Sequence, residues 1–270
     1  WNWLVSGLAS GASIVLYDGS PAHPDLRSLW RMADRTEITH FGTSPKFLAA
    51  CSKSELVPKE VAGLSNFKSL LSTGAPLVPE QFDWVYDNVK SDIQLASISG
   101  GTDIIGCFLA GSPILPVYRG ELQCPQLGMD VQSWNVDGKP VIGESGELVC
   151  ASPFPSMPIS FWNDEDGSSY RSAYFDDFEG VWTHGDYVEM TTTGGAIIYG
   201  RSDTTLNPGG VRIGTAEIYR SVENMDQIVD AVVVGRPNKG DVEVVLFVKL
   251  GDGIIFDDAL KSDISAQIRS

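Results

Sequence analysis

Segments typical of strands and segments typical of helices alternate through the first hundred residues, and this order constrains the fold most. Apolar runs that end in glycine predict strands at 13–19, 38–42, 67–74 and 93–101. Helices are predicted between them at 25–35, 45–54 and 79–90. This alternation is typical of a mostly parallel sheet covered on both faces, so we expect an α/β fold. Ligands bind such sheets beyond the carboxyl ends of the strands, where segments 72–77 and 97–103 lie.

The composition changes after residue 112, and we expect three regions. Residues 1–112 form the α/β part with its parallel sheet and flanking helices. Residues 113–200 are rich in Gly, Pro and aromatic residues and predict a small β-rich, barrel-like subdomain, with a hairpin around Asp137 and Gly138. Residues 201–270 contain a helix pattern, two apolar strand patterns and a second helix pattern, which predict the start of a small α+β domain.

Charge and cysteine content exclude several classes of function. The net charge is −16, the opposite of what a nucleic-acid-binding protein carries, so we expect no nucleic-acid partner. The four cysteines form no C-x-x-C pair, which argues against a zinc site and favours a reduced, cytosolic compartment. No apolar run approaches the roughly 18 residues of a membrane span. An anionic ligand must therefore meet local Arg or Lys side chains, helix N-termini or a metal.

The most specific stretch is GRSDTTLNPGGVRIGTAEIY, residues 200–219. Its form, G-R-x-D-x-x-x-N-x-x-G-x-R-I-G-x-x-E-I, resembles the hinge motif of the AMP-forming acyl-CoA synthetases of the adenylate-forming superfamily. STGAPL (72–77), SISGGTD (97–103) and THGDY (183–187) are similar, in order, to the adenine loop, the Thr-acid loop and the ribose-binding Gly-Asp of that family. Each motif alone is compatible with an ordinary turn, cap or surface ion pair, but together they cover essentially the whole chain.

Several further blocks resemble one branch of the family, the cytosolic branch that activates acetoacetate and lies close to the acetate-activating enzymes. These blocks are LYDGSP, LPVYRGELQ, GESGELVC and FWNDEDG. The resemblance implies a two-step reaction that uses ATP, Mg²⁺ and CoA. A carboxylate attacks the α-phosphate of ATP to give an acyl-adenylate and pyrophosphate, and the CoA thiol then displaces AMP.

The resemblance also implies roles for individual residues. Those expected at the nucleotide and CoA are Gly74, Ala75, Pro76, Ser97, Ile98, Ser99, Gly100, Gly101, Thr102, Asp186, Arg201, Gly209 and Arg212. Thr102 and Asp103 are expected to be catalytic, with Thr102 donating to a phosphate oxygen and Asp103 binding Mg²⁺. Relatives usually carry Glu at the position of Asp103, so a bridging water could replace direct metal contact. Asp203 is expected to be the hinge about which the small domain rotates.

Gly100 departs from the acetate-activating enzymes, which carry a tryptophan there that closes the acyl pocket. The missing ring favours a longer acid such as acetoacetate. The alternative is that Gly100 only serves a backbone turn, and pocket size alone does not separate acetoacetate from butyrate. The block resemblance is what favours the keto acid.

Two catalytic features of the family do not occur within these 270 residues. The phosphate loop would lie upstream of Trp1 and the adenylation lysine downstream of Ser270, so we expect a fragment of a longer enzyme with little or no ligase activity by itself. Two other interpretations stay open. One is a ligase for another short or medium-chain acid, and the other is a non-catalytic nucleotide-binding relative.

Overall fold

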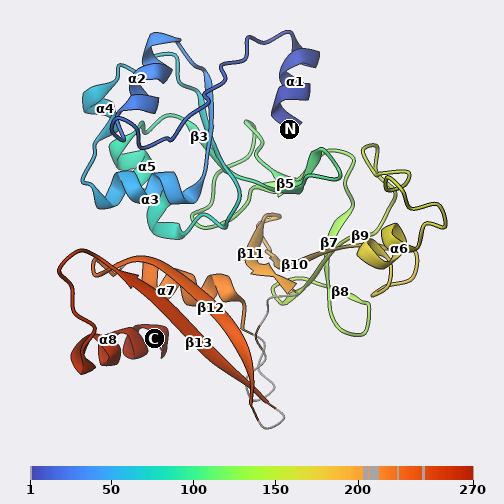
Figure 1. Cartoon of the computed structure of the whole chain (residues 1–270). Helices are drawn as coiled ribbons and strands as arrows, with labels where there is room; N and C mark the ends of the chain where they lie inside the picture. Colours follow the sequence, from blue (N-terminus) through green and yellow to red (C-terminus); the bar gives the residue numbers. More distant parts are fainter. Residues whose placement is uncertain (1, 203–205, 207–212, 224, 239–240, 270) are drawn as a thin grey trace.

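The computed structural model describes the chain except residues 1, 203–205, 207–212, 224, 239–240 and 270. Three groups of elements follow one another along the chain, and Figure 1 shows their arrangement. The first is built on a parallel sheet, the second on antiparallel sheets, and the third on a long hairpin with two helices. None of the described helices combines the length and the apolar content that a bilayer crossing needs.

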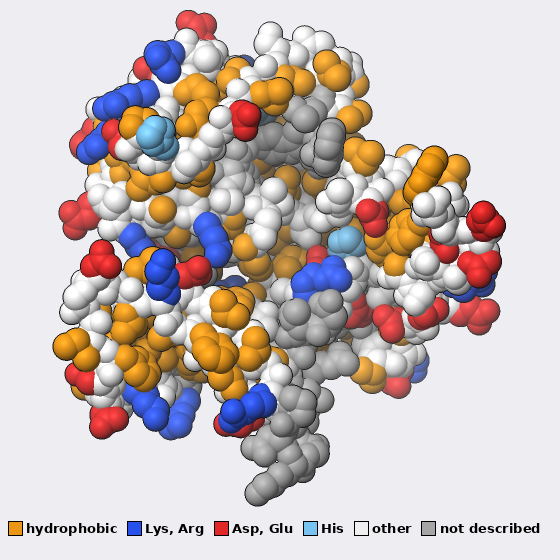
Figure 2. Space-filling view, in the orientation of Figure 1, with side chains coloured by type: hydrophobic (Ala, Val, Ile, Leu, Met, Phe, Trp, Pro, Cys, Tyr) orange, Lys and Arg blue, Asp and Glu red, His pale blue; other side chains and the backbone are white. Residues whose placement is uncertain are grey.

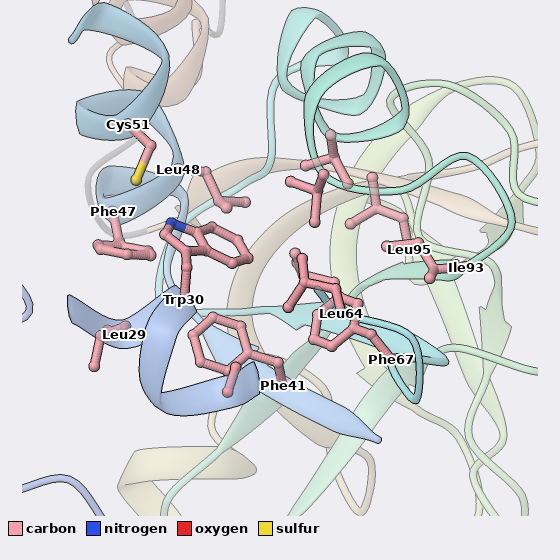
Figure 3. Close-up of a cluster of buried hydrophobic side chains, with 14 of the residues drawn as sticks. Leu29, Trp30, Phe41, Phe47, Leu48, Cys51, Leu64, Phe67, Ile93 and Leu95 are labelled. Carbon is pink, nitrogen blue, oxygen red and sulfur yellow. The ribbon is translucent and has the colours of Figure 1, made fainter. Parts of the chain in front are cut away.

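The first group confirms the predicted parallel sheet. Its helices are α1 (Asn2–Ser10), α2 (Ser28–Arg35), α3 (Pro45–Lys53), α4 (Pro58–Val61) and α5 (Pro79–Asn88), and its strands are β1 (His40–Thr43), β2 (Ser69–Ser72) and β3 (Gln94–Ser97). Strand β2 lies between β1 and β3 and is parallel to both. Trp30 of α2 is completely buried and joins helices to sheet, with its ring 5.8 Å from Phe47 and 5.4 Å from Phe41 (Figure 3).

The strand predicted at 13–19 is wrong, because these residues form no strand. An apolar segment becomes a strand only where a neighbour supplies backbone hydrogen bonds, and no described strand pairs with this one. Leu16 is 72% exposed as a result. The strand predicted at 93–101 is also interrupted at Ile98, and Ser99 begins a new strand in a different sheet.

The second group consists of two antiparallel sheets and a short helix. A three-stranded sheet contains β4 (Ser99–Gly101), β5 (Gly106–Ala110) and β6 (Cys124–Pro125). The five-stranded sheet has the order β11-β10-β9-β7-β8, with β7 (Val131–Trp134), β8 (Pro140–Val141), β9 (Ser145–Cys150), β10 (Trp182–Met190) and β11 (Ala196–Arg201), and the helix is α6 (Ser168–Tyr174). The predicted hairpin is confirmed, since Trp134 pairs with Pro140. The boundary at 112 stays a prediction, because Phe108 already packs in the core of this group.

The third group pairs β12 (Ile228–Asn238) with β13 (Asp241–Leu250) and adds α7 (Thr215–Glu223) and α8 (Asp258–Arg269). It contacts α3 through two lysines. Lys53 Nζ donates to the carbonyl oxygen of Ile228 at 2.8 Å, and Lys46 Nζ lies 3.4 Å from Asp230 Oδ1. Figure 2 shows blue and red side chains meeting along this boundary. The mixed order of elements, with parallel and antiparallel sheets, confirms the predicted α/β class.

Candidate functional site

The loops that follow β2 and β3 lie side by side at the carboxyl ends of the parallel strands. The Ile98 N–H donates to the carbonyl oxygen of Ser72 at 2.9 Å, and Thr73 Oγ1 donates to the carbonyl oxygen of Ile98 at 3.1 Å. Ser97, which precedes them in β3, is buried. These bonds connect the segment expected at the adenine to the segment expected at the ribose and phosphates.

Gly74 gives the first of these loops an open surface. Its φ is +93°, a value that side-chain-bearing residues rarely adopt, and nothing lies within 4 Å of the place a Cβ would occupy. Ala75 is exposed and Pro76 is half-buried. A flat ring could therefore approach this backbone, and the adenine role of the three residues stays a prediction.

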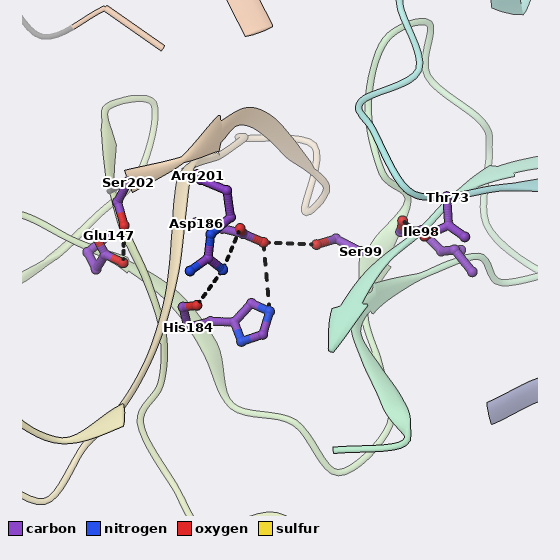
Figure 4. A network of polar contacts seen from close by, with 8 residues as sticks. All are labelled: Thr73, Ile98, Ser99, Glu147, His184, Asp186, Arg201 and Ser202. Atoms are coloured by element: carbon purple, nitrogen blue, oxygen red, sulfur yellow. Dashed lines mark hydrogen bonds and ion pairs between the residues drawn. The ribbon is translucent and has the colours of Figure 1, made fainter. Parts of the chain in front are cut away.

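Asp186 on β10 is the centre of the polar network in Figure 4. Its Oδ2 accepts a hydrogen bond from Ser99 Oγ at 3.4 Å and lies 3.9 Å from His184 Nε2. Its Oδ1 accepts from Arg201 Nη1 at 3.4 Å, because β10 and β11 place these two residues in register. The network thus brings together three residues expected at the nucleotide, although Ser99 and Asp186 are 87 residues apart.

Arg201 is held over the turn that precedes Asp186. Its Nη1 donates to the carbonyl oxygen of His184 at 2.9 Å. A Cβ at Gly185 would lie 2.5 Å from Arg201 Nη2, so a side chain there would displace the guanidinium. The Arg201 side chain is 50% exposed, which leaves it accessible to an anion or a sugar hydroxyl.

His184 connects the network to the hydrophobic core. Its ring lies 4.5 Å from that of Phe108 and packs against the backbone of Gly101. Burial lowers the pKa of His184, and this outweighs the opposite effect of the Asp186 carboxylate. The imidazole is therefore neutral at physiological pH and adds no positive charge for a phosphate.

Thr102 and Asp103 lie in the exposed turn that joins β4 to β5. The Ile105 N–H donates to the carbonyl oxygen of Thr102 at 3.2 Å, and the fully buried side chain of Ile104 fixes the turn to the core. The hydroxyl of Tyr174 donates to Asp103 Oδ2. Burial and this hydrogen bond raise the pKa of Tyr174, so its hydroxyl stays protonated and remains a donor.

The donors in this turn fit a magnesium ion that arrives with a nucleotide. Within the described part of the chain, no group of three or more His, Cys, Asp or Glu side chains is placed to hold a metal. Asp103 offers a single exposed carboxylate. Protein-bound Mg²⁺ usually takes one or two carboxylates and completes its shell with substrate phosphates and water. Asp103 can therefore serve as the predicted Mg²⁺ ligand only if a nucleotide phosphate also coordinates the ion.

The pairing of β4 with β5 requires a glycine at position 100. It pairs with Cys107 of β5, and a Cβ there would overlap the carbonyl oxygen of Gly106 and lie 2.7 Å from Cys107 Cα. A side chain would have to separate β4 from β5. The acyl-pocket role of Gly100 stays a prediction, and the observed geometry favours the alternative that the glycine serves the backbone.

Sequence reasoning missed Glu147 on β9. Its Oε1 accepts a hydrogen bond from Ser202 Oγ at 2.9 Å, and its carboxylate also accepts from the backbone N–H of Gly185. Glu147 therefore ties the turn that carries Asp186 to the end of β11. Burial raises the pKa of Glu147 to about 6, and the negative charge of Asp177 adds to this effect. The available signal was a glutamate within the apolar strand GELVC.

We expect Glu147→Gln to flatten the dependence of stability on pH. The pKa of Glu147 is about 6 in the fold against an ordinary 4.5, so its contribution to the free energy of unfolding is complete below pH 4.5 and is lost as pH rises through 6. The loss is at most about 1 kcal/mol after solvent screening. Urea unfolding between pH 4.5 and 7 measures it, with Glu144→Gln as the exposed control. Identical pH profiles for wild type and Glu147→Gln would contradict the burial argument.

Three predicted site residues lie outside the described residues. They are Asp203, Gly209 and Arg212, and their roles as hinge, CoA contact and phosphate contact stay predictions. On either side of the gap, the Leu206 N–H donates to the carbonyl oxygen of Ile213 at 2.9 Å. The Gly214 N–H then donates to Glu217 Oε1 at 2.9 Å, a contact of the capping-box type at the start of α7.

The chain is similar to known proteins over its whole length. Acetoacetyl-coenzyme A synthetase of Rhizobium meliloti (strain 1021) is 55% identical over 270 residues, and acetoacetyl-CoA synthetase of Danio rerio is 51% identical over 271 residues. Each match covers 100% of this chain but only 42% and 40% of the relative, so the chain spans about two fifths of their length.

Solved structures show the same fold. Acetoacetyl-CoA synthetase from Streptomyces lividans has a TM-score of 0.91 at 47% identity, and the match covers 100% of this chain and 41% of that one. An anthranilate CoA ligase, at 22% identity, shares the fold with a TM-score of 0.76 over 96% of this chain and 48% of its own. The model of the AMP-binding enzyme family matches residues 1–157, which is more than half of the chain. The resemblance drawn from the four motifs is thereby confirmed, and the chain belongs to the AMP-binding enzyme family.

Proposed function

We propose that the protein to which this chain belongs activates acetoacetate with ATP and transfers it to CoA. The observation that carries the proposal is the network in which Ser99, Asp186 and Arg201 converge (Figure 4). His184 joins this network to the start of the Thr102–Asp103 turn, because its ring packs against Gly101. Relatives that are named acetoacetyl-CoA synthetases and are about half identical over the whole chain support the choice of acid. The products are acetoacetyl-CoA, AMP and pyrophosphate.

The first half-reaction needs a nucleotide that is bound in one fixed orientation. Asp186 would accept hydrogen bonds from the ribose hydroxyls, and Arg201 would donate to the ribose or a phosphate. The two side chains are already held in register by β10 and β11. A fixed nucleotide lets the acetoacetate carboxylate oxygen attack the α-phosphorus in line while the bond to pyrophosphate breaks. The Mg²⁺ held with Asp103 would supply charge neutralisation on the phosphates.

The second half-reaction transfers the acyl group. The CoA sulfur attacks the acyl carbon, the bond to the AMP oxygen breaks, and the thiol proton leaves to solvent or base. The resemblance of the motif GRSDTTLNPGGVRIGTAEIY to the family hinge implies that the hinge and the CoA contacts lie between residues 203 and 212. We propose Asp203 as the hinge and Gly209 as the residue beside the CoA arm, with Arg212 at the phosphates.

We expect the full-length enzyme to catalyse ATP–pyrophosphate exchange that depends on acetoacetate, and to turn over butyrate and acetate at least tenfold less efficiently. A difference of this size corresponds to about 1.4 kcal/mol in the transition state, which a polar contact to the keto oxygen can supply. The measurement is kcat/KM across the three acids, with thioester formation as the second readout. Equal kcat/KM values for butyrate and acetoacetate would contradict the choice of acetoacetate and would favour the alternative, a ligase for another short or medium-chain acid. Absence of exchange with every acid would favour the non-catalytic nucleotide-binding alternative.

We further propose a reducing, cytosolic location. The proposal is supported by four cysteines that form no disulfide in the structure, namely Cys51, Cys107, Cys124 and Cys150. Labelling of the thiols in protein purified without reductant checks it. Each of these four cysteines is expected to be labelled after denaturation, and a disulfide among them would count against the proposal.

A further inference from the structure

We propose that Tyr174 is the residue that positions Asp103 for the metal–nucleotide complex, an inference that rests on the function proposed above. Tyr174 is the last residue of α6, and its hydroxyl donates a hydrogen bond to Asp103 Oδ2 across 71 residues of sequence. None of the sequence motifs includes Tyr174. The bond leaves Oδ1 as the carboxylate oxygen for a cation.

The position of the Tyr174 hydroxyl is set by its ring. That ring stacks on Trp182 with a centroid distance of 3.7 Å and an interplanar angle of 14°. Trp182 is 1% exposed, so the surface under Tyr174 is part of the core. Phe161 and Tyr170 meet the Tyr174 ring edge-on at 5.9 and 6.0 Å. Contacts on its face and its edges thus fix the direction in which the hydroxyl points.

Asp103 needs such a partner because its own surroundings do not fix it. The residue is exposed in a four-residue turn, where a short carboxylate otherwise exchanges freely between rotamers. A hydrogen bond from a rigid donor removes that freedom before the ion arrives. Partners of this kind typically change metal affinity or activity by 10–100-fold when they are removed. In this proposal Tyr174 acts through Asp103 and is a positioning residue.

The test is Tyr174→Phe in the full-length enzyme, which removes the hydroxyl and keeps the stacked ring. We expect the Mg²⁺ concentration at half-maximal ATP binding, measured by calorimetry at fixed ATP, to rise about tenfold. The KM for acetoacetate and the melting temperature should stay close to wild type. The matched control is Tyr170→Phe, which removes a hydroxyl from the same aromatic cluster; that hydroxyl donates to the carbonyl oxygen of Pro158 at 2.6 Å and not to Asp103. Its Mg²⁺ dependence should be unchanged.

A double-mutant cycle separates positioning from a general packing effect. In an Asp103→Ala background, Tyr174→Phe should add no further loss of Mg²⁺ affinity, because the only route by which it acts has been removed. An equal loss in both backgrounds, or an unchanged Mg²⁺ dependence of Tyr174→Phe, would overturn the inference while leaving the proposed function intact. Wild-type enzyme that binds no ATP at any Mg²⁺ concentration would overturn both.

Discussion

Replacement of Trp182 by Ala should lower the free energy of unfolding by about 3–5 kcal/mol, the range observed when a buried aromatic ring is truncated. Trp182 is 1% exposed and packs against other aromatic rings. Phe154 lies 5.3 Å away, Tyr174 3.7 Å and Phe108 6.4 Å, all as centroid distances. The indole leaves a cavity in this aromatic cluster that the surrounding side chains fill only in part. Urea unfolding of the purified enzyme measures the change.

The matched control for this prediction is Trp162→Ala. Trp162 is 91% exposed, so its removal should change the free energy of unfolding by no more than about 0.5 kcal/mol. Trp182→Phe should fall between the two, because it keeps part of the buried area. Trp182→Ala should also affect the site, because it removes the surface on which Tyr174 stacks. Mg²⁺-dependent ATP binding should therefore weaken even at temperatures at which the variant is still folded. A loss under 1 kcal/mol for Trp182→Ala would contradict the packing argument.

Periodic apolar residues made most of the fold predictable. Helix α5 has apolar residues at Phe82 and Val85 that are buried, as its spacing predicts. The hairpin between β7 and β8 follows from its Asp-Gly turn. Local sequence contained enough information for these elements because their partners are near in the chain. The segment 13–19 shows the limit, since its apolar pattern is typical of a strand but no described strand hydrogen-bonds to it.

Site residues whose role is indicated by a recognisable motif could be predicted from the sequence. Residues that act through a partner far away in the chain could not. Asp186 and Ser99 belong to recognisable motifs, and the structure brings them to 3.4 Å. Glu147 lies within the block GESGELVC, but that block does not indicate its partner Ser202, 55 residues away. Tyr174 lies in an ordinary helix, 71 residues from its partner Asp103. No local pattern encodes such distant pairs. Positioning side chains of this kind become visible only when the strand order and the core are known.

Replacement of Asp186 by Ala should raise the KM for ATP by about 10–100-fold. Hydrogen bonds to a charged group are worth about 1.5–3 kcal/mol, and Asp186 would accept them from the ribose. Its side chain is 13% exposed and contacts Ser99, His184 and Arg201, so alanine also removes the group that holds these three side chains together. The KM for acetoacetate should change little, because the ribose and the acid bind at different ends of the adenylate. Steady-state kinetics with each substrate varied in turn measures both constants.

The sharpest form of this prediction uses the sugar itself. Wild-type enzyme should discriminate against 2′-deoxy-ATP and 3′-deoxy-ATP, since each lacks a hydroxyl that Asp186 would bind. Asp186→Ala should lose most of that discrimination, because the buried acceptor that penalises the missing hydroxyl is gone. Asp177→Ala removes the same charge from an exposed position near Glu147 and should keep the wild-type preference for ATP. If Asp186→Ala still rejects the deoxynucleotides as strongly as wild type, Asp186 organises Arg201 and Ser99 without contacting the ribose, and the nucleotide contact must come from one of those two side chains instead.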